Sequence, residues 1–220
     1  MDPNDSITLR YFPLNGRGVF IRCMLEVSKI PYTNKVIPFE EWGKMEKPSN
    51  IFEYGFLPVL EYNGKFMSQS GAIVLFLAKK LELYGSNDWE AYLINEIMAT
   101  KDDFMPELGG LLFSRSKISD EEADKQIKNL NECTLPWILS ILESKFVNRK
   151  GKYWVGDKVS VADIFAVYIH YLLFNKALKG ALDEVAKKYA PKLLAHAEAM
   201  KTNELKDYFV NGSFYQDAPL

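Results

Sequence analysis

The sequence predicts two domains in succession, a small α/β domain followed by an all-helical bundle. Strand and helix patterns alternate over about the first 80 residues, which is typical of an α/β domain. Beyond this region strand signals disappear and apolar residues recur at helical spacing. With 220 residues, 48% of them apolar and 25% charged, the chain is long enough to bury a core in each part.

The first elements predict a parallel strand–helix–strand unit. Apolar and polar residues alternate in residues 7–11, which predicts a half-buried strand, and residues 32–37 predict a second strand. Between them, apolar residues recur at the spacing of a helix that packs on a sheet: Val19, Phe20, Cys23, Met24 and Val27. Residues 38–55 show no period and are expected to be irregular.

A hairpin and a third helix complete the predicted α/β domain. Residues 58–62 and 65–68 are two short extended runs joined by Asn63-Gly64, a pair that tolerates the positive φ angles of a type I′ turn. Ser70 then offers an N-cap to a helix that is apolar nearly all round and is expected to be mostly buried. We therefore assign residues 5–83 to the first domain and residues 84–90 to a linker.

Residues 91–220 are assigned to the helical domain. Two Ser-x-x-acidic sequences, starting at Ser119 and Ser160, have the spacing of capping boxes and open long apolar-periodic segments. Pro136 is expected to kink the first of these segments, and the second reads as the central helix of a bundle. A further helix is predicted for residues 191–200, and the tail from Tyr208 is expected to be irregular.

Composition argues against several kinds of partner. The chain has 27 Lys and Arg residues and 29 Asp and Glu residues, so its composition shows no excess of basic residues for binding nucleic acid or anionic lipid. Two cysteines far apart and two histidines make a metal site improbable. The first residues lack the basic and apolar regions of a signal peptide, and the apolar stretch 164–174 is too short to span a bilayer. We expect a cytoplasmic protein with no metal, nucleic-acid or membrane partner.

Common phosphate-binding and nucleophile motifs are absent from the sequence. Gly16 and Gly18 follow a strand, but Ile21 occupies the third glycine position of a dinucleotide fingerprint. No Gly-Lys-Ser or Gly-Lys-Thr follows a glycine-rich loop, and no Gly-x-Ser-x-Gly elbow exists.

Three sets of polar residues in the first domain are not explained by core packing. In an open α/β sheet, the carboxyl ends of strands and the helix N-termini beyond them form the ligand crevice, so we expect the sets to converge there. Arginine, lysine and helix-terminal N–H groups suit the carboxylates of a small polyanion. The sets are Tyr11 with Arg17, Trp42 with Lys44 and Lys47, and Gln69 with Ser70.

The chain resembles the cytosolic glutathione transferases, most closely the sigma class, over essentially its whole length. No single motif is specific, but five occur in the family's order across both domains. They are residues 11–17 leading to Ile21-Arg22, residues 57–60 before Asn63-Gly64, Gln69-Ser70 before Ala72-Ile73, residues 101–105, and residues 159–163.

This resemblance implies a thioredoxin-like N-terminal domain that binds glutathione, an all-α C-terminal domain that binds a hydrophobic second substrate, and a homodimer. It makes Tyr11 the catalytic residue. A thiol has a pKa of about 8.5 and only its thiolate is nucleophilic, so a hydroxyl that donates to the sulfur lowers that pKa.

The resemblance also assigns the other glutathione contacts. Leu57, before a cis proline at Pro58, would pair its backbone with the cysteinyl residue, and Gln69 and Ser70 would hold the γ-glutamyl end. Arg17, Trp42 and a lysine would complete the glycine side; Lys44 and Lys47 compete for this role, and we favour Lys47 because Lys-Pro is the family's pairing. The remaining assignments are Asp103 from the partner subunit and a hydrophobic pocket of Leu14, Phe104, Leu108 and Phe113.

The leading hypothesis is a glutathione transferase that adds glutathione to hydrophobic electrophiles. A glutathione-dependent isomerase similar to prostaglandin D synthase, or a peroxidase, would use the same thiolate on another second substrate. A non-catalytic, crystallin-like or ligand-carrier protein is the alternative from another class. The sequence does not separate these alternatives, because a pocket of apolar side chains tolerates wide variation.

Overall fold

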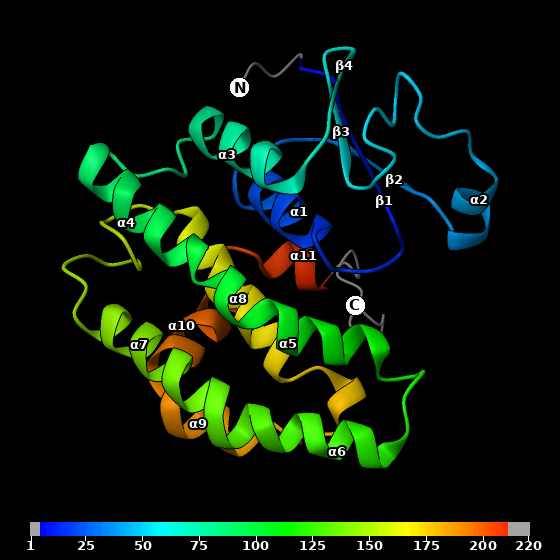
Figure 1. The fold of residues 1–220 in the computed structure, drawn as a ribbon. Coiled ribbons are helices and arrows are strands. Elements are labelled where there is room, and N and C mark those ends of the chain that lie inside the picture. Colours follow the sequence, from blue (N-terminus) through cyan, green and yellow to red (C-terminus); the bar gives the residue numbers. More distant parts are fainter. Residues whose placement is uncertain (1–4, 211–220) are drawn as a thin grey trace. The chain divides into compact units, whose positions relative to one another are not determined.

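The computed structural model describes residues 5–210, which divide into two compact units (Figure 1). The first unit contains residues 5–84 and residues 205–210, and the second contains residues 85–204. A mixed sheet with helices forms the first unit, and helices alone form the second. This confirms the predicted order of an α/β unit followed by a helical unit.

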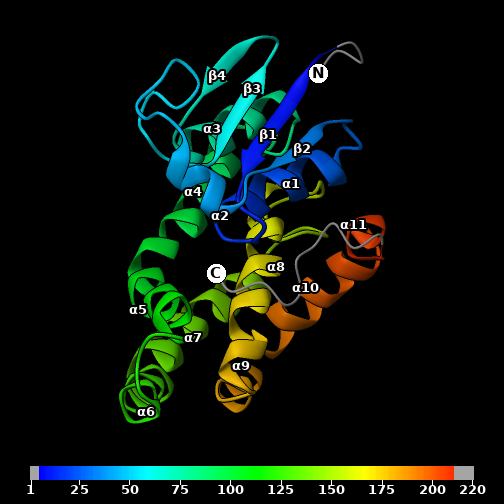
Figure 2. The same cartoon turned by 90° about the vertical axis from the view of Figure 1, so that its right-hand side faces the viewer.

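A four-stranded sheet in the order β2-β1-β3-β4 forms the centre of the first unit (Figure 2). Strand β1 pairs in parallel with β2 and antiparallel with β3, and β3 pairs antiparallel with β4. The predicted strands and the parallel unit are thus confirmed. Their bounds are β1 (Ile7–Tyr11), β2 (Thr33–Val36), β3 (Val59–Tyr62) and β4 (Lys65–Met67).

This topology brings four chain segments to one edge of the sheet, which we call the common edge. Because β3 is antiparallel to both β1 and β4, strands β1, β2 and β4 run in one direction and end at the same edge, where β3 begins. The pairings agree with this: Tyr11 lies opposite Val36, and Arg10 lies opposite Val59. Residues that directly follow β1, β2 or β4, or directly precede β3, therefore lie next to the common edge.

The turn between β3 and β4 has the predicted conformation. Asn63 and Gly64 both have positive φ angles, 50° and 77°. The Asn63 side chain also accepts a hydrogen bond from the Ser6 backbone N–H at 2.8 Å, so the turn is fixed to the chain that precedes β1.

Four helices belong to the first unit: α1 (Gly18–Val27), α2 (Phe39–Lys44), α3 (Ser70–Lys80) and α11 (Lys206–Val210). Helix α2 corrects the expectation of an irregular segment; it begins after Pro38, whose carbonyl accepts from the Trp42 N–H at 2.9 Å. The chain was expected to be irregular from Tyr208 onward, but Tyr208 lies in α11, where it is 1% exposed. The tail beyond Val210 lies outside the described residues.

Two expectations for α3 were wrong. Gln69, not Ser70, is the N-cap, because the Gln69 carbonyl accepts from the Ile73 N–H at 3.0 Å and Ser70 is already helical. The helix is also not mostly buried: of its eleven residues only Ile73, Leu77 and Ala78 are, and Leu75 is 40% exposed. Apolar residues on all sides of a helix therefore do not show that the rest of this chain covers every side of it.

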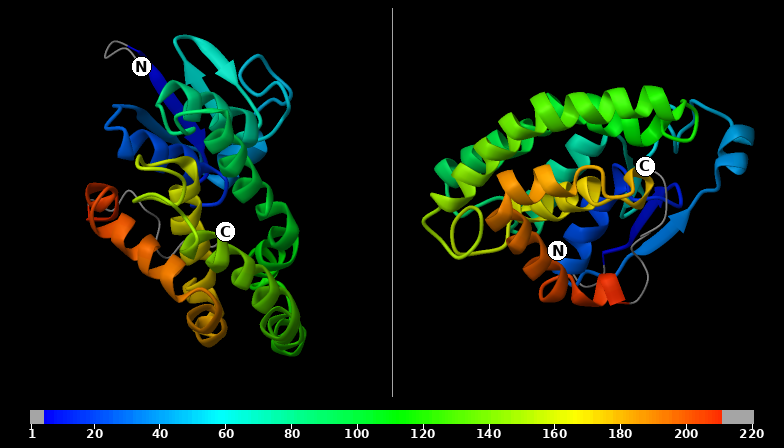
Figure 3. Two further views of the ribbon diagram at one scale, coloured as in Figure 1. Left: turned by 90° about the vertical axis from the view of Figure 1, so that its left-hand side faces the viewer. Right: turned by 90° about the horizontal axis from the view of Figure 1, so that it is seen from below.

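The helical unit contains seven α-helices and two short irregular turns of helix among its described residues (Figure 3). They are α4 (Asp88–Ala99), α5 (Lys101–Ser114), α6 (Asp120–Asn129), the π-helical turn η1 (Leu130–Thr134), α7 (Leu135–Val147), α8 (Val161–Leu173), the 3₁₀ turn η2 (Lys176–Leu178), α9 (Asp183–Tyr189) and α10 (Pro191–Thr202). The predicted linker 84–90 is helical from Asp88 onward, where Asn87 caps α4.

Helix α8 is the core of this unit, as predicted. All of its residues are buried except His170. The apolar stretch is longer than the predicted 164–174: an 18-residue window, Val161–Leu178, has the length and the mean hydropathy, 1.3, of a membrane span, but 78% of it is buried inside the protein. Its place in the core accounts for its apolar composition.

A π-helical turn precedes Pro136, where the sequence predicts a kink. Proline has no N–H and cannot donate to the helix turn before it. The α6 helix ends at Asn129, η1 covers Leu130–Thr134, and α7 resumes with Pro136 in its first turn. The helix thus continues through the proline with one widened turn instead of ending there.

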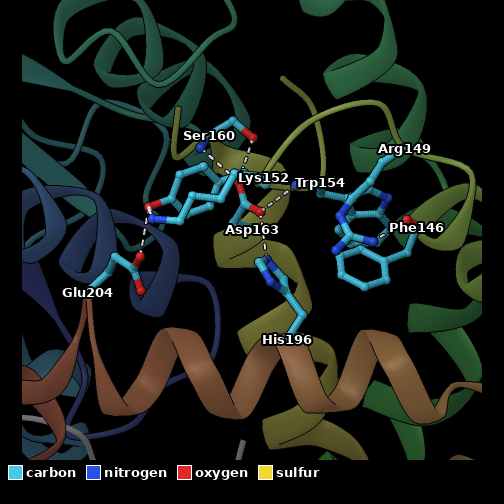
Figure 4. Close-up of polar contacts among 9 residues, drawn as sticks. Phe146, Arg149, Lys152, Trp154, Ser160, Asp163, His196 and Glu204 are labelled. Atoms are coloured by element: carbon cyan, nitrogen blue, oxygen red, sulfur yellow. Dashed lines mark hydrogen bonds and ion pairs between the residues drawn. The ribbon is translucent and has the colours of Figure 1, made fainter. Parts of the chain in front are cut away.

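Asp163 is the polar centre of the helical unit (Figure 4). Its buried carboxylate accepts the backbone N–H groups of Ser160 and Trp154, each at 2.8 Å, and the Ser160 hydroxyl at 3.0 Å. The His196 ring of α10 lies 2.7 Å away through Nε2. The capping box predicted at Ser160 is therefore present, and its aspartate also fixes the preceding loop and α10.

Removing this carboxylate should destabilise the helical unit strongly. We expect Asp163→Ala to reduce the free energy of unfolding by about 3–5 kcal/mol, because the buried donors around it lose their partner. Urea denaturation measures this change. Ser119→Ala, which removes the exposed cap of α6, should cost only about 1 kcal/mol; equal effects of the two variants would contradict a special role of Asp163.

Candidate functional site

Tyr11 lies at the common edge with its hydroxyl oriented by α1. Its side chain belongs to the last residue of β1 and is 6% exposed. The hydroxyl oxygen accepts a hydrogen bond from the backbone N–H of Arg17, at 3.0 Å. Since that oxygen is engaged as an acceptor, the phenol proton is available for donation to another group.

The surroundings of Tyr11 keep it in the protonated form. Burial raises the pKa of Tyr11 above its ordinary value of 10.0 and outweighs the opposing effects of nearby N–H groups and arginines. The backbone N–H of Arg17 is the largest of these opposing influences. Tyr11 is therefore a neutral hydrogen-bond donor throughout the physiological pH range.

Arg22 fixes the loop between β1 and α1. It is fully buried, and its guanidinium donates to the carbonyl of Leu14 at 2.8 Å and to the side chain of Asn34 at 3.3 Å. It also donates to the carbonyl of Phe12 at 3.4 Å and lies 5.7 Å from the centre of the Tyr11 ring. These bonds hold the turn that carries Arg17, although Arg17 itself is exposed.

Phe12 connects the Tyr11 loop to α2 through aromatic contacts. Its ring stacks on Phe39 with centres 4.5 Å apart and meets Trp42 edge-on at 5.9 Å. Trp42 in turn meets Phe52 edge-on at 5.0 Å, and Leu57 packs on the same apolar cluster. No residue of α2 is buried, so these contacts are its main attachment.

The structure separates the two candidate lysines. Lys47 lies beside Trp42: its Nζ donates to the Trp42 carbonyl at 2.7 Å and sits 4.0 Å from the indole centre. Lys44 instead pairs with Glu40 at 2.7 Å, with both side chains mostly in solvent. Only Lys47 is thus held at the aromatic cluster.

The segment before β3 and the segment after β4 also lie next to the common edge. The Leu57–Pro58 peptide bond is cis, directly before β3. Gln69 follows β4 with φ 67° and ψ 103°, an uncommon conformation for a residue with a side chain, and Ser70 is the first residue of α3. Such conformations cluster at ligand-binding sites.

The candidate residues of the helical unit differ in exposure. Asp103 lies in the first turn of α5 with an exposed side chain. Phe104 and Leu108 are 2% and 0% exposed, and Phe104 packs near Phe165 of α8. Phe113 is 62% exposed, whereas Leu14 in the first unit is 5% exposed.

Among residues 5–210, no three histidine, cysteine, aspartate or glutamate side chains gather in a way that could hold a metal ion. Cys23 is buried in α1 and Cys133 is exposed in η1, and both are free thiols. The polar groups of the common edge are instead hydroxyls, amides and basic side chains, which suit an anionic organic molecule.

Comparisons with known proteins show which family and which fold the chain is similar to. Residues 103–212 match the family described as "Glutathione S-transferase, C-terminal domain". Hematopoietic prostaglandin D synthase of Gallus gallus is 32% identical over 194 residues, which cover 88% of each protein. The fold is similar to that of a sigma-class glutathione transferase of Fasciola hepatica, with a TM-score of 0.80 at 22% identity over 96% of this chain and 97% of that one. A monomeric glutathione S-transferase of Necator americanus gives a TM-score of 0.77 at 26% identity over 94% and 97%.

Phe12 and Arg22 enter the sequence-based prediction only as members of one motif, and the contacts that they make were not predicted. Phe12 follows Tyr11 directly, so its side chain leaves the strand on the opposite side, and no sequence pattern shows that α2 meets it there. The burial of Arg22 is equally invisible, because arginine is rarely buried unless it is fully hydrogen-bonded. The signal available was a charged residue within the apolar stripe of α1.

If Phe12 attaches α2, then Phe12→Ala should loosen that helix. Aromatic pairs contribute about 0.5–1.5 kcal/mol each, so loss of two contacts should accelerate amide hydrogen exchange in residues 39–48 by about 10- to 100-fold. Phe76→Ala, which removes the contact to Tyr62 elsewhere in the unit, is the matched control. Equal exchange of α2 in both variants would show that Phe12 does not hold it.

Proposed function

The chain belongs to the cytosolic glutathione transferase family, and on this premise we propose that Tyr11 activates the thiol of glutathione for addition to hydrophobic electrophiles. The observation that carries the proposal is the hydrogen bond from the Arg17 N–H to the Tyr11 hydroxyl. It leaves the phenol proton free to donate to a sulfur atom. The co-substrate is glutathione, and the reaction needs no metal.

The proposed step is a nucleophilic attack. The thiol proton passes to solvent, and the Tyr11 hydroxyl donates to the sulfur and stabilises the thiolate. The sulfur then forms a bond to the electrophilic carbon, and a leaving group such as chloride departs with its electron pair. Tyr11 keeps its own proton, in keeping with the raised pKa of its phenol.

Glutathione is a tripeptide with two carboxylates, and the common edge offers separate groups for its parts. We assign the γ-glutamyl end to Gln69 and Ser70 at the start of α3, where helix N–H groups favour a carboxylate. The backbone of Leu57 beside Pro58 would pair with the cysteinyl residue. Trp42, Lys47 and Arg17 would hold the glycine end.

The second substrate is assigned to apolar side chains. Phe113 supports this role because its ring is accessible on α5. Phe104 and Leu108, which the sequence analysis places in the same pocket, have almost no exposed surface and would act by fixing α5. Leu14, in the loop after β1, is only 5% exposed and would likewise act by packing, within the first unit.

A glutathione-dependent isomerase is the second candidate function, favoured by the similarity to a prostaglandin D synthase. It would use the same thiolate on a different second substrate. Product analysis with a prostaglandin endoperoxide, beside initial rates with a chloro-nitroaromatic compound, distinguishes the two. Turnover of the aromatic compound alone supports the transferase, and glutathione binding without any turnover supports a carrier.

The proposal includes a homodimer in which Asp103 of the partner subunit contacts glutathione. The exposed Asp103 side chain in the first turn of α5 is compatible with such a contact. Light scattering measures the oligomeric state. If the protein is a monomer, Asp103→Asn should leave the affinity for glutathione unchanged; if it is a dimer with this contact, the affinity should fall.

Replacement of Tyr11 by Phe tests the activating hydroxyl directly. We expect Tyr11→Phe to lower kcat by about 10²-fold or more, the effect of losing one hydrogen-bond donor to a developing anion, with little change in glutathione affinity. The rise of activity with pH should move to higher pH, because the sulfur keeps its proton longer. Unchanged turnover would exclude Tyr11 as the activating group.

The lysine assignment predicts different outcomes for two similar variants. Lys47→Met should weaken glutathione binding by about 5- to 50-fold, the loss of one charge-assisted hydrogen bond, as measured by isothermal titration. Lys44→Met, the matched control, removes only an exposed ion pair with Glu40 and should leave affinity unchanged. The reverse result would assign the role to Lys44.

A further inference from the structure

The segment Gly16-Arg17-Gly18 encloses the side chain of Tyr11. A Cβ atom placed on Gly18 would lie 2.4 Å from Cδ1 and 2.9 Å from Cγ of the Tyr11 ring. A Cβ atom on Gly16 would lie 2.6 Å from the Tyr11 hydroxyl. All three distances are far below van der Waals contact, so the tyrosine occupies space that the side chain of any other residue at these positions would fill.

The two glycines are needed for different reasons. Gly16 has a φ angle of +30°, which a residue with a side chain adopts only with strain. Gly18 is the first residue of α1, in a helical conformation that every residue can adopt. Glycine in a helix is less favourable than alanine by up to about 1 kcal/mol, so the backbone gives no reason for glycine at this position.

The Tyr11 ring has little freedom to move away from Gly18. Its backbone pairs with β2 through Val36, and the ring is nearly buried, at 6% exposure. The guanidinium of Arg22 lies 5.7 Å from the ring centre. A methyl group on residue 18 would therefore displace either the ring or the first turn of α1, and both movements disturb the 3.0 Å bond from Arg17 to the hydroxyl.

We infer that Gly18 is a positioning residue, whose missing side chain lets the Tyr11 ring seat against α1 so that the hydroxyl meets the Arg17 N–H. This inference rests on the proposed function, because Tyr11 is the residue that would contact the glutathione sulfur. Gly18 has no side chain with which to bind a substrate. It acts by setting the position of the Tyr11 hydroxyl.

Gly18→Ala tests this role. We expect kcat to fall at least about 10-fold with little change in the KM for glutathione, because a small displacement of a catalytic group is costly. The pH at which bound glutathione shows the ultraviolet absorbance of a thiolate should rise in parallel. Gly110→Ala in α5, where a Cβ would meet nothing within 4 Å, is the matched control and should change neither quantity.

A double-mutant cycle separates positioning from a general structural role. In a Tyr11→Phe background, where the hydroxyl is gone, Gly18→Ala should cause almost no further loss of kcat. An equal loss in both backgrounds, or normal activity of Gly18→Ala, would overturn the inference. The proposed function fails separately, if Tyr11→Phe itself remains fully active.

If Gly18→Ala does not fold, a second variant still decides the question. Tyr11→Leu combined with Gly18→Ala removes the ring with which the new methyl group collides. Recovery of a folded protein, seen by circular dichroism, would support the contact between residue 18 and the ring. Continued failure to fold would overturn the inference, because the glycine would then serve the fold for another reason.

Discussion

The hydrogen bond from the Arg17 N–H to the Tyr11 hydroxyl is the constraint around which the first unit is arranged. It requires the Tyr11 hydroxyl, at the end of β1, to lie 3.0 Å from the Arg17 nitrogen at the beginning of α1, although a loop of several residues separates the two elements. A tight turn at Gly16 and the buried guanidinium of Arg22 make this approach possible. The sheet contributes by fixing β1 between β2 and β3, so that Tyr11 cannot shift along the strand.

Sequence patterns predicted the elements well because each one has a local cause. The alternation in residues 7–11, the Asn63-Gly64 turn and the Ser160 capping box depend on neighbours in the chain, and all three are present. Ser70 illustrates the limit of such patterns: its residue type suits an N-cap, but the unusual backbone of Gln69 starts the helix one residue earlier. Only the path of the chain from β4 decides between them.

The candidate site was predicted as a set of residues, and the geometry between them was not. Tyr11 ends β1, Trp42 follows β2 and Gln69 follows β4, and the shared direction of these three strands brings their ends to the common edge. The contacts between the Tyr11 loop and α2 are less visible in the sequence. Phe12 and Arg22 act through tertiary contacts with residues distant in the chain, namely Phe39, Trp42 and Asn34.

The two sides of the candidate site differ in how firmly they are held. Tyr11 is fixed by a paired strand, a buried arginine and the first turn of α1. Helix α2 has no buried residue and is attached by aromatic contacts and by the packing of Trp42 on a buried apolar cluster. Ligand-binding segments are drawn from the less stable parts of a fold, since they must admit and release a ligand. The chemistry proposed for Tyr11 requires a fixed hydroxyl, and capture of a flexible tripeptide requires a segment that can move. The buried β1–α1 corner suits the first requirement and the more exposed α2 suits the second, within one small unit.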